Sequence, residues 1–143
     1  MTEDSINLLK ECDSGTKTAV SSIREVLDNV KSEELLNLLT HSLEEHEKIG
    51  NETHELLKEA NEDGKEPSVM ARAMSWMKIN VDLAAKPSDR TIADLMTDGC
   101  NMGIKQISVY FNKYPNADQR VKNLVDKIRV EEDDLVQKLR TYL

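Results

Sequence analysis

The chain has 143 residues, which is enough for one domain around one hydrophobic core. Only 3% of the residues are aromatic, and five glycines and three prolines are few, which argues against a β-sandwich or β-barrel. The 27 acidic and 19 basic residues give a net charge of −8, which argues against nucleic acids and anionic membranes as partners, and no apolar run is long enough to span a membrane.

Two helices joined by a short turn are predicted first. Residues 5–30 carry one apolar or small stripe at spacings of three and four, as is typical of a buried helix face. Ser32, followed by two glutamates, predicts the N-cap of the second helix, and Gly64 is expected to end that helix in a left-handed conformation. The stripes are Leu8, Cys12, Gly15, Ala19, Ile23, Val26 and Val30, then Leu36, Leu39, Leu43, His46, Gly50, Thr53 and Leu57.

A third, amphipathic helix is predicted over residues 68–85, with Pro67 at its first turn. The side expected to pack on the other helices carries Met70, Met74 (or Ala73), Met77, Val81 and Ala84. A soft-metal site or partner groove is the alternative for these methionines. Trp76, Ile79 and Leu83 lie off this stripe, and they predict a surface that meets a second copy of the chain.

The last two helices are predicted on either side of Pro115. Ser88 or Asp89 caps the fourth helix, and Asn116 with Gln119 resembles a capping box for the fifth. The fourth helix carries Met96, Cys100, Gly103, Ile107 and Tyr114, and the fifth carries Val121, Leu124, Ile128, Glu131, Leu135, Lys138 (or Leu139) and Tyr142.

An internal repeat relates the two helix pairs. Cys12-x-x-Gly15-x-Lys17 recurs 88 residues later as Cys100-x-x-Gly103-x-Lys105. The following helices match at a separation of 87, whereas the apolar stripes pair His46 with Glu131, so this register stays open. The sequence therefore predicts one all-α domain over residues 1–143, built as an up-down four-helix bundle from an αα-hairpin (5–61), a crossover helix (66–86) and a second αα-hairpin (88–143).

Paired hairpins with a lengthwise crossover resemble the ferritin-like superfamily, over essentially the whole chain. Metal-binding members of that family hold a di-iron centre with a glutamate from the first and third bundle helices and a Glu-x-x-His from the other two. Here Cys12, Gly15, Cys100 and Gly103 stand at the midpoints of the first and third bundle helices, and no Glu-x-x-His occurs. The resemblance therefore implies the fold, and we expect no di-iron oxidase or iron-storage activity.

Four polar or thiol residues are predicted to share the middle layer of this bundle: Cys12, His46, Cys100 and Glu131. Together they are a chemically reasonable ligand set for a divalent metal such as zinc or iron. The alternative is that the cysteines are small buried residues and that His46 and Glu131 form a hydrogen bond across the core.

Gly15 and Gly103 each predict a close approach of helices or, alternatively, room for a small ligand between them. Lys17 is expected in solvent or beside Glu45, and His41 and His54 are expected on the surface. No nucleophile elbow, phosphate-binding glycine loop or metalloprotease motif is present, so we expect no enzymatic activity.

Residues 1–5 form no basic segment and no apolar segment follows, so no secretion signal is expected, and the two cysteines are expected as reduced thiols. The sequence thus predicts a cytoplasmic, non-enzymatic binding or structural protein that forms a homo-oligomer, most simply a dimer, and it does not identify a small-molecule ligand. The alternative is a metal-binding protein with a degenerate site in the bundle core.

Overall fold

The computed structural model describes the backbone of residues 1–143 and all side chains except those of Val69, Met70, Ala73, Met74, Trp76 and Met77. The described backbone is all-helical, without a strand. Its elements are α1 (Glu3–Leu27), α2 (Glu33–Glu59), α3 (Val69–Ala85), α4 (Asp89–Lys113), α5 (Gln119–Leu139) and a short 3₁₀ turn (Arg140–Tyr142). None of these helices, as far as their residues are described, is long and apolar enough to cross a membrane.

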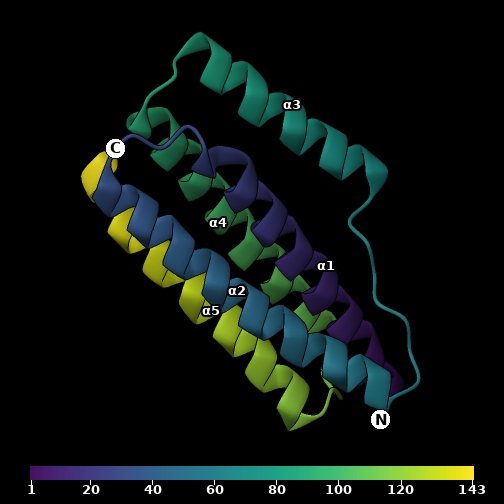
Figure 1. The fold of residues 1–143 in the computed structure, drawn as a ribbon. Coiled ribbons are helices and arrows are strands. Elements are labelled where there is room, and N and C mark those ends of the chain that lie inside the picture. The colour runs from purple at the N-terminus through teal and green to yellow at the C-terminus, as the bar shows by residue number, and fades with distance from the viewer.

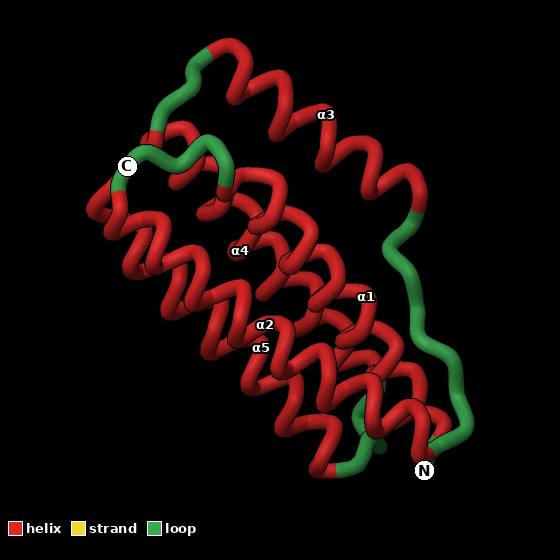
Figure 2. The backbone as a smooth tube through the Cα atoms, in the orientation of Figure 1, coloured by secondary structure: helices red, strands yellow, loops and turns green.

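Four long helices lie side by side, and the fifth runs along one flank of the bundle (Figure 1). α1 packs on α2, and α4 packs on α5, so each predicted hairpin forms. The hairpins then meet through α1 against α4 and α2 against α5. α3 packs on α1 and α4 and is joined to the bundle by a loop at each end (Figure 2).

Each hairpin turn is held by an acidic residue at the start of the other hairpin. The Asp89 carboxylate accepts hydrogen bonds from the backbone N–H groups of Lys31 and Ser32, at 2.8 and 2.9 Å. At the opposite end of the bundle, Asp4 accepts a hydrogen bond of 2.8 Å from the Asn116 N–H. These backbone donors would otherwise be unpaired at helix ends. The hydrogen bonds at the two ends of the bundle therefore fix how the hairpins sit against each other.

The predicted helix caps are confirmed in part. The Ser32 and Ser88 hydroxyls accept hydrogen bonds from the N–H groups of residues 35 and 91, as N-caps do. The predicted capping box at Asn116 is wrong, because Asp118 is the N-cap of α5 and its side chain makes no capping bond. Pro67 likewise precedes Ser68, the N-cap of α3, rather than opening the helix.

Gly64 does not end α2 in a left-handed conformation, because the residue with positive φ is Asn61, at 56°. The loop after α2 instead passes close to α1, so that a Cβ at Gly64 would clash with Asp13 Oδ2. The buried Asp13 carboxylate accepts hydrogen bonds from the Lys65 N–H and from Lys17 Nζ, both at 2.8 Å. Lys17 is therefore neither free in solvent nor beside Glu45, since it binds Asp13 and thereby anchors the loop.

The crossover helix packs through different residues from those predicted. Ile79 and Leu83 are 6% and 7% exposed and belong to the core, whereas Val81 is 61% exposed. The prediction that Ile79 and Leu83 face a second protomer is therefore wrong. The predicted packing of the side chains of Met70, Met74, Met77 and Trp76 lies outside the described residues.

The core consists of two apolar clusters, one toward each end of the bundle. One contains Ile23, Leu39 and Cys100, and the other contains Leu8, Cys12 and Leu124. Between them the buried side chains are polar: Asp13, Thr16, Ser42, His46 and Glu132. Buried polar groups cost folding free energy unless they are paired, so this middle layer is the part of the core to examine for function.

Candidate functional site

The middle layer brings one histidine of α2 beside one glutamate of α5. His46 and Glu132 are 1% and 6% exposed, and His46 Nε2 lies 3.7 Å from Glu132 Oε1. Buried residues of the two helices match at a separation of 86: Leu35 with Val121, Leu39 with Val125, His46 with Glu132, and Ile49 with Leu135. These pairs are equivalent positions of the repeat and not neighbours in space, since Leu35 and Val121 belong to different apolar clusters. The 3.7 Å contact is what places Glu132, and not the predicted Glu131, beside His46; Glu131 is only half-buried.

The hydrogen bonds of His46 determine which of its nitrogens faces the carboxylate. Nδ1 lies 2.8 Å from the Ser42 carbonyl oxygen, one helical turn earlier. A carbonyl oxygen can only accept, so Nδ1 carries the hydrogen and Nε2 is left with a lone pair in the neutral ring. Among the described residues, neither His46 Nε2 nor Glu132 Oε2 has a hydrogen-bond partner, although both atoms are buried.

The pKa values of both groups are raised. Burial acts to lower the pKa of His46, but the Glu132 carboxylate and the Ser42 carbonyl outweigh it and raise that pKa above its ordinary value of 6.5. Burial raises the pKa of Glu132 above 4.5, and the neighbouring His46 opposes this rise. Both shifts favour protonation, so the pair retains a proton more readily than the same groups do in water.

Gly103 of α4 makes room for the Glu132 carboxylate. A Cβ at this position would lie 2.5 Å from Glu132 Oε2 and 2.7 Å from Oε1, closer than real Cβ contacts allow. Gly15, the counterpart in α1, is exposed and has nothing within 4 Å of the same point. The predicted close approach of helix backbones is therefore wrong for Gly15, and at Gly103 the close neighbour is the side chain of Glu132 and not a helix backbone.

The cysteines do not join the His46–Glu132 pair in a metal centre. Both are buried, at 0% and 7% exposure, which confirms the predicted inward orientation. Cys12 belongs to one apolar cluster and Cys100 to the other. Among the described side chains, no three of the His, Cys, Asp and Glu type are grouped to hold a metal ion. The predicted set of Cys12, His46, Cys100 and Glu131 is therefore not assembled.

The di-iron centre that the ferritin-like resemblance implies does not fit this middle layer. Such a centre needs several carboxylates that converge from all four bundle helices. Here Glu132 is the one buried glutamate of the described core, and Gly103 leaves only the room that this side chain fills. The pair could at most hold a single ion together with further ligands.

Burial makes the two thiols poor nucleophiles. The pKa of Cys12 and that of Cys100 are both raised from 9.0 to about 12, chiefly by burial and in smaller part by nearby carboxylates, Glu11 and Asp13 for Cys12 and Glu132 for Cys100. The thiolate is the reactive form, so the cysteines offer no nucleophile at neutral pH.

We expect both thiols to resist alkylation in the folded protein. At pH 8 a pKa near 12 leaves a thiolate fraction of about 0.0001, against about 0.1 for an unperturbed thiol, before access is considered. Iodoacetamide labelling followed by mass spectrometry should therefore show almost no modification without denaturant. Both cysteines should react quickly in urea, and fast labelling of either one in the native protein would contradict their burial.

A groove between α1 and α2 reaches His46 from the surface. It has a volume of about 670 Å³, and its lining includes Asp13, Thr16, His46 and Gly50. A Cβ at Gly50 would lie 3.5 Å from Thr16 Oγ1, so this stretch of the groove is narrow. The groove gives a small solute or ion a route toward the buried pair.

The His46–Glu132 pair makes the stability of the fold depend on pH. Because both pKa values are raised on folding, the native chain holds more protons than the unfolded chain, so stability falls as pH rises from 4.5 through the folded pKa values. Glu131 contributes with the same sign, because burial raises its pKa too.

Urea unfolding should therefore give a free energy of unfolding that declines as the pH rises above the ordinary pKa values of the two groups, 4.5 and 6.5. A variant with leucine at both His46 and Glu132 keeps all other charged groups of the protein. The decline of its free energy of unfolding with pH should be clearly shallower. Equal slopes for the two proteins would show that the pair does not titrate as described.

Comparisons with known proteins support the fold of this chain but do not assign it to a family. No family model matches the sequence, and no curated protein matches it. Among solved structures, the chain is similar to the crystal structure of a DUF305 fragment from Deinococcus radiodurans, with a TM-score of 0.76 and 14% sequence identity. The match covers 98% of this chain and 95% of that one. At this level of identity the likeness concerns the fold alone, and it supports an all-α helical bundle.

Proposed function

We propose that this protein is a non-enzymatic binding protein of the ferritin-like type and that His46 and Glu132 form its binding centre. The two hairpins and the lengthwise crossover support the ferritin-like assignment. The observation that carries the function is that His46 Nε2 and Glu132 Oε2 are buried without a hydrogen-bond partner among the described residues. Each such atom costs about 1–3 kcal/mol of folding free energy, a cost that a bound cation would relieve.

A single divalent metal ion is the ligand that this centre suits best. The Ser42 carbonyl holds the hydrogen on Nδ1, which leaves the Nε2 lone pair available as a metal ligand. A glutamate oxygen is a common second ligand. Two protein ligands leave several coordination positions for water or a small anion, which the groove between α1 and α2 can admit. When bound, the ion would compensate the buried carboxylate charge.

Metal analysis and thermal unfolding test this proposal. We expect protein purified without added metal to retain zinc, iron or manganese, and the melting temperature to rise on adding the ion, since a ligand at a hundred times its dissociation constant contributes about 2.7 kcal/mol. His46→Gln should abolish the rise. His41→Gln is the matched control, because His41 is an exposed histidine of the same helix and does not line the groove between α1 and α2.

Two outcomes oppose the proposal. Less than about a tenth of an equivalent of any metal, with no gain in melting temperature on addition, would exclude a metal at the pair. A gain that persists in His46→Gln would place the metal elsewhere on the chain.

A self-associating structural protein is the second candidate. Met102 and Val109 are 66% and 52% exposed and lie seven residues apart, on one face of α4. Burying such residues between two copies would be favourable. The mass of the protein in solution at high concentration tests this candidate, and a strict monomer would exclude it.

A further inference from the structure

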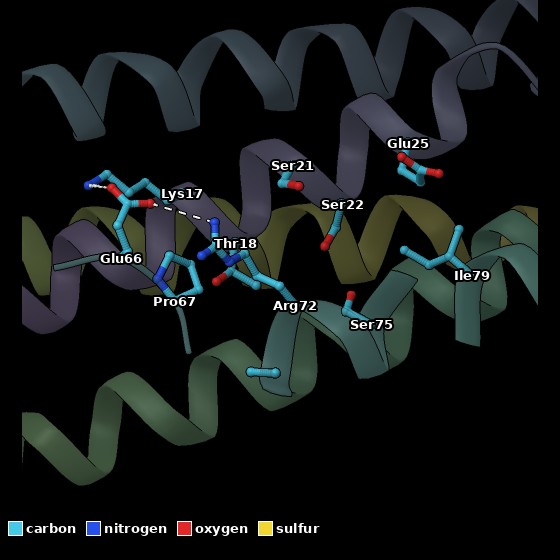
Figure 3. A pocket seen from close by; sticks show the side chains of 11 residues that line it. Lys17, Thr18, Ser21, Ser22, Glu25, Glu66, Pro67, Arg72, Ser75 and Ile79 are labelled. Carbon is cyan, nitrogen blue, oxygen red and sulfur yellow. Dashed lines mark hydrogen bonds and ion pairs between the residues drawn. The ribbon is translucent and has the colours of Figure 1, made fainter. Parts of the chain in front are cut away.

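A second cavity lies away from the His46–Glu132 pair, between α1 and the crossover helix α3. Its volume is about 510 Å³, within the range of small-molecule sites. Lys17, Ser22 and Glu25 come from α1, and Arg72, Ser75 and Ile79 come from α3 (Figure 3). We refer to this cavity as the crossover pocket.

Several hydrogen-bond donors in the crossover pocket have no protein acceptor. The Arg72 guanidinium forms no hydrogen bond with a described residue, and its ion-pair contact, to Glu66 Oε2, measures 4.0 Å, beyond hydrogen-bond length. No described side chain bonds to the hydroxyls of Ser22 or Ser75 either, and Figure 3 shows these hydroxyls directed toward each other across the gap, with Arg72 reaching from α3 to α1. These three side chains together present a set of free N–H and O–H donors.

The acidic neighbour of Arg72 is already engaged. Glu66 Oε1 lies 2.7 Å from Lys17 Nζ, and this contact lowers the pKa of Glu66. Lys17 is in turn held by Asp13 at 2.8 Å. Glu66 is thus hydrogen-bonded to Lys17 at the rim, while the Arg72 guanidinium, which lines the pocket, approaches the second oxygen of Glu66 only to 4.0 Å (Figure 3).

The rest of the described lining has an apolar part and a polar part, the polar part being Thr18, Ser21 and Glu25. Pro67 is buried, and it lines the pocket with Ala71 and Ile79. A bare inorganic ion would leave these apolar surfaces exposed to water. An organic ligand would cover them, and the burial of apolar surface would contribute favourably to its binding free energy.

From these contacts we propose that the crossover pocket binds a small organic anion. Its carboxylate or phosphate group takes hydrogen bonds from the Arg72 guanidinium and from the Ser22 and Ser75 hydroxyls, and its carbon body lies against Pro67, Ala71 and Ile79. Guanidinium groups bind both kinds of oxyanion through paired N–H donors. This site is independent of the His46–Glu132 centre.

Amide NMR of the ¹⁵N-labelled full chain, titrated at constant ionic strength, tests the pocket. The probes are butyrate, butyl phosphate, inorganic phosphate and, as the neutral match for the carbon body, butanol. We expect saturable shifts at residues 22, 72 and 75 with at least one organic anion at concentrations up to about 20 mM, as suits ligands of this size. Inorganic phosphate should bind more weakly than butyl phosphate, and butanol should not saturate. Whichever of butyrate and butyl phosphate binds more tightly shows whether the pocket prefers a carboxylate or a phosphate head group.

Variants separate the pocket from a general effect of charge. Arg72→Gln should weaken the organic anion about tenfold, the loss expected for a charge-assisted contact. Arg24→Gln is the matched control and should leave binding unchanged, because Arg24 is an exposed arginine of α1 that pairs with Glu47 outside this pocket. Helical content by circular dichroism confirms that each variant folds. The proposal is overturned if none of the anions saturates, or if Arg72→Gln and Arg24→Gln bind alike.

Discussion

Replacing Gly103 with alanine is expected to lower the free energy of unfolding by about 1–3 kcal/mol, the usual range for inserting an atom into a filled core. The added Cβ would lie 2.5–2.9 Å from three atoms of the Glu132 carboxyl group. Glu132 is 6% exposed, so the end of its side chain cannot swing into solvent without losing its place beside His46. Urea unfolding at neutral pH measures the change.

Gly15→Ala is the matched control, since Gly15 occupies the corresponding place in α1 with nothing within 4 Å of the added atom. Alanine is the better helix former by about 0.5–1 kcal/mol, so this variant should be more stable than the parent. The two substitutions should thus have opposite signs. If Gly103→Ala were also stabilising, the Glu132 carboxylate would not fill the space beside Gly103.

Removing His46 alone is expected to have the larger effect. His46→Leu leaves the Glu132 carboxyl group buried without its partner, and breaking a buried pair in this way costs about 3–5 kcal/mol. Because Glu132 becomes neutral when protonated, the loss should be smaller at acidic pH than at pH 8. Urea unfolding at both pH values measures it.

The variant with leucine at both positions should recover most of this loss. Replacing a buried polar pair by apolar side chains of similar volume is often neutral or stabilising. His54→Leu, at an exposed position of the same helix, should change stability little. A double variant no more stable than His46→Leu would mean that the pair itself stabilises the fold. If the double variant is stable but its melting temperature no longer rises when metal is added, the role of the pair is to bind the metal.

The helices, their main caps and the burial of both cysteines could be predicted from the sequence. These features depend on neighbours along the chain: apolar residues three or four apart, a serine before two acidic residues, a proline between segments. For the same reason the prediction of Ser32 as an N-cap is confirmed, and of the two candidates Ser88 and Asp89 the structure shows Ser88 as the N-cap of α4. Such local signals do not depend on which helix is packed opposite.

The partner of His46 could not be predicted, because both Glu131 and Glu132 continue the stripe of α5 from Ile128 at a spacing of three or four. Only the packing of α5 on α2 and α4 distinguishes them, and the signal that agrees with it is the glycine at position 103, which makes room for one carboxylate. Gly64 is similar: its close approach to Asp13 joins residues 51 positions apart, which no local pattern records. The crossover pocket also requires α3 to be placed against α1. Helix formation is thus a property of short segments, whereas the site depends on contacts between segments that are distant in the chain.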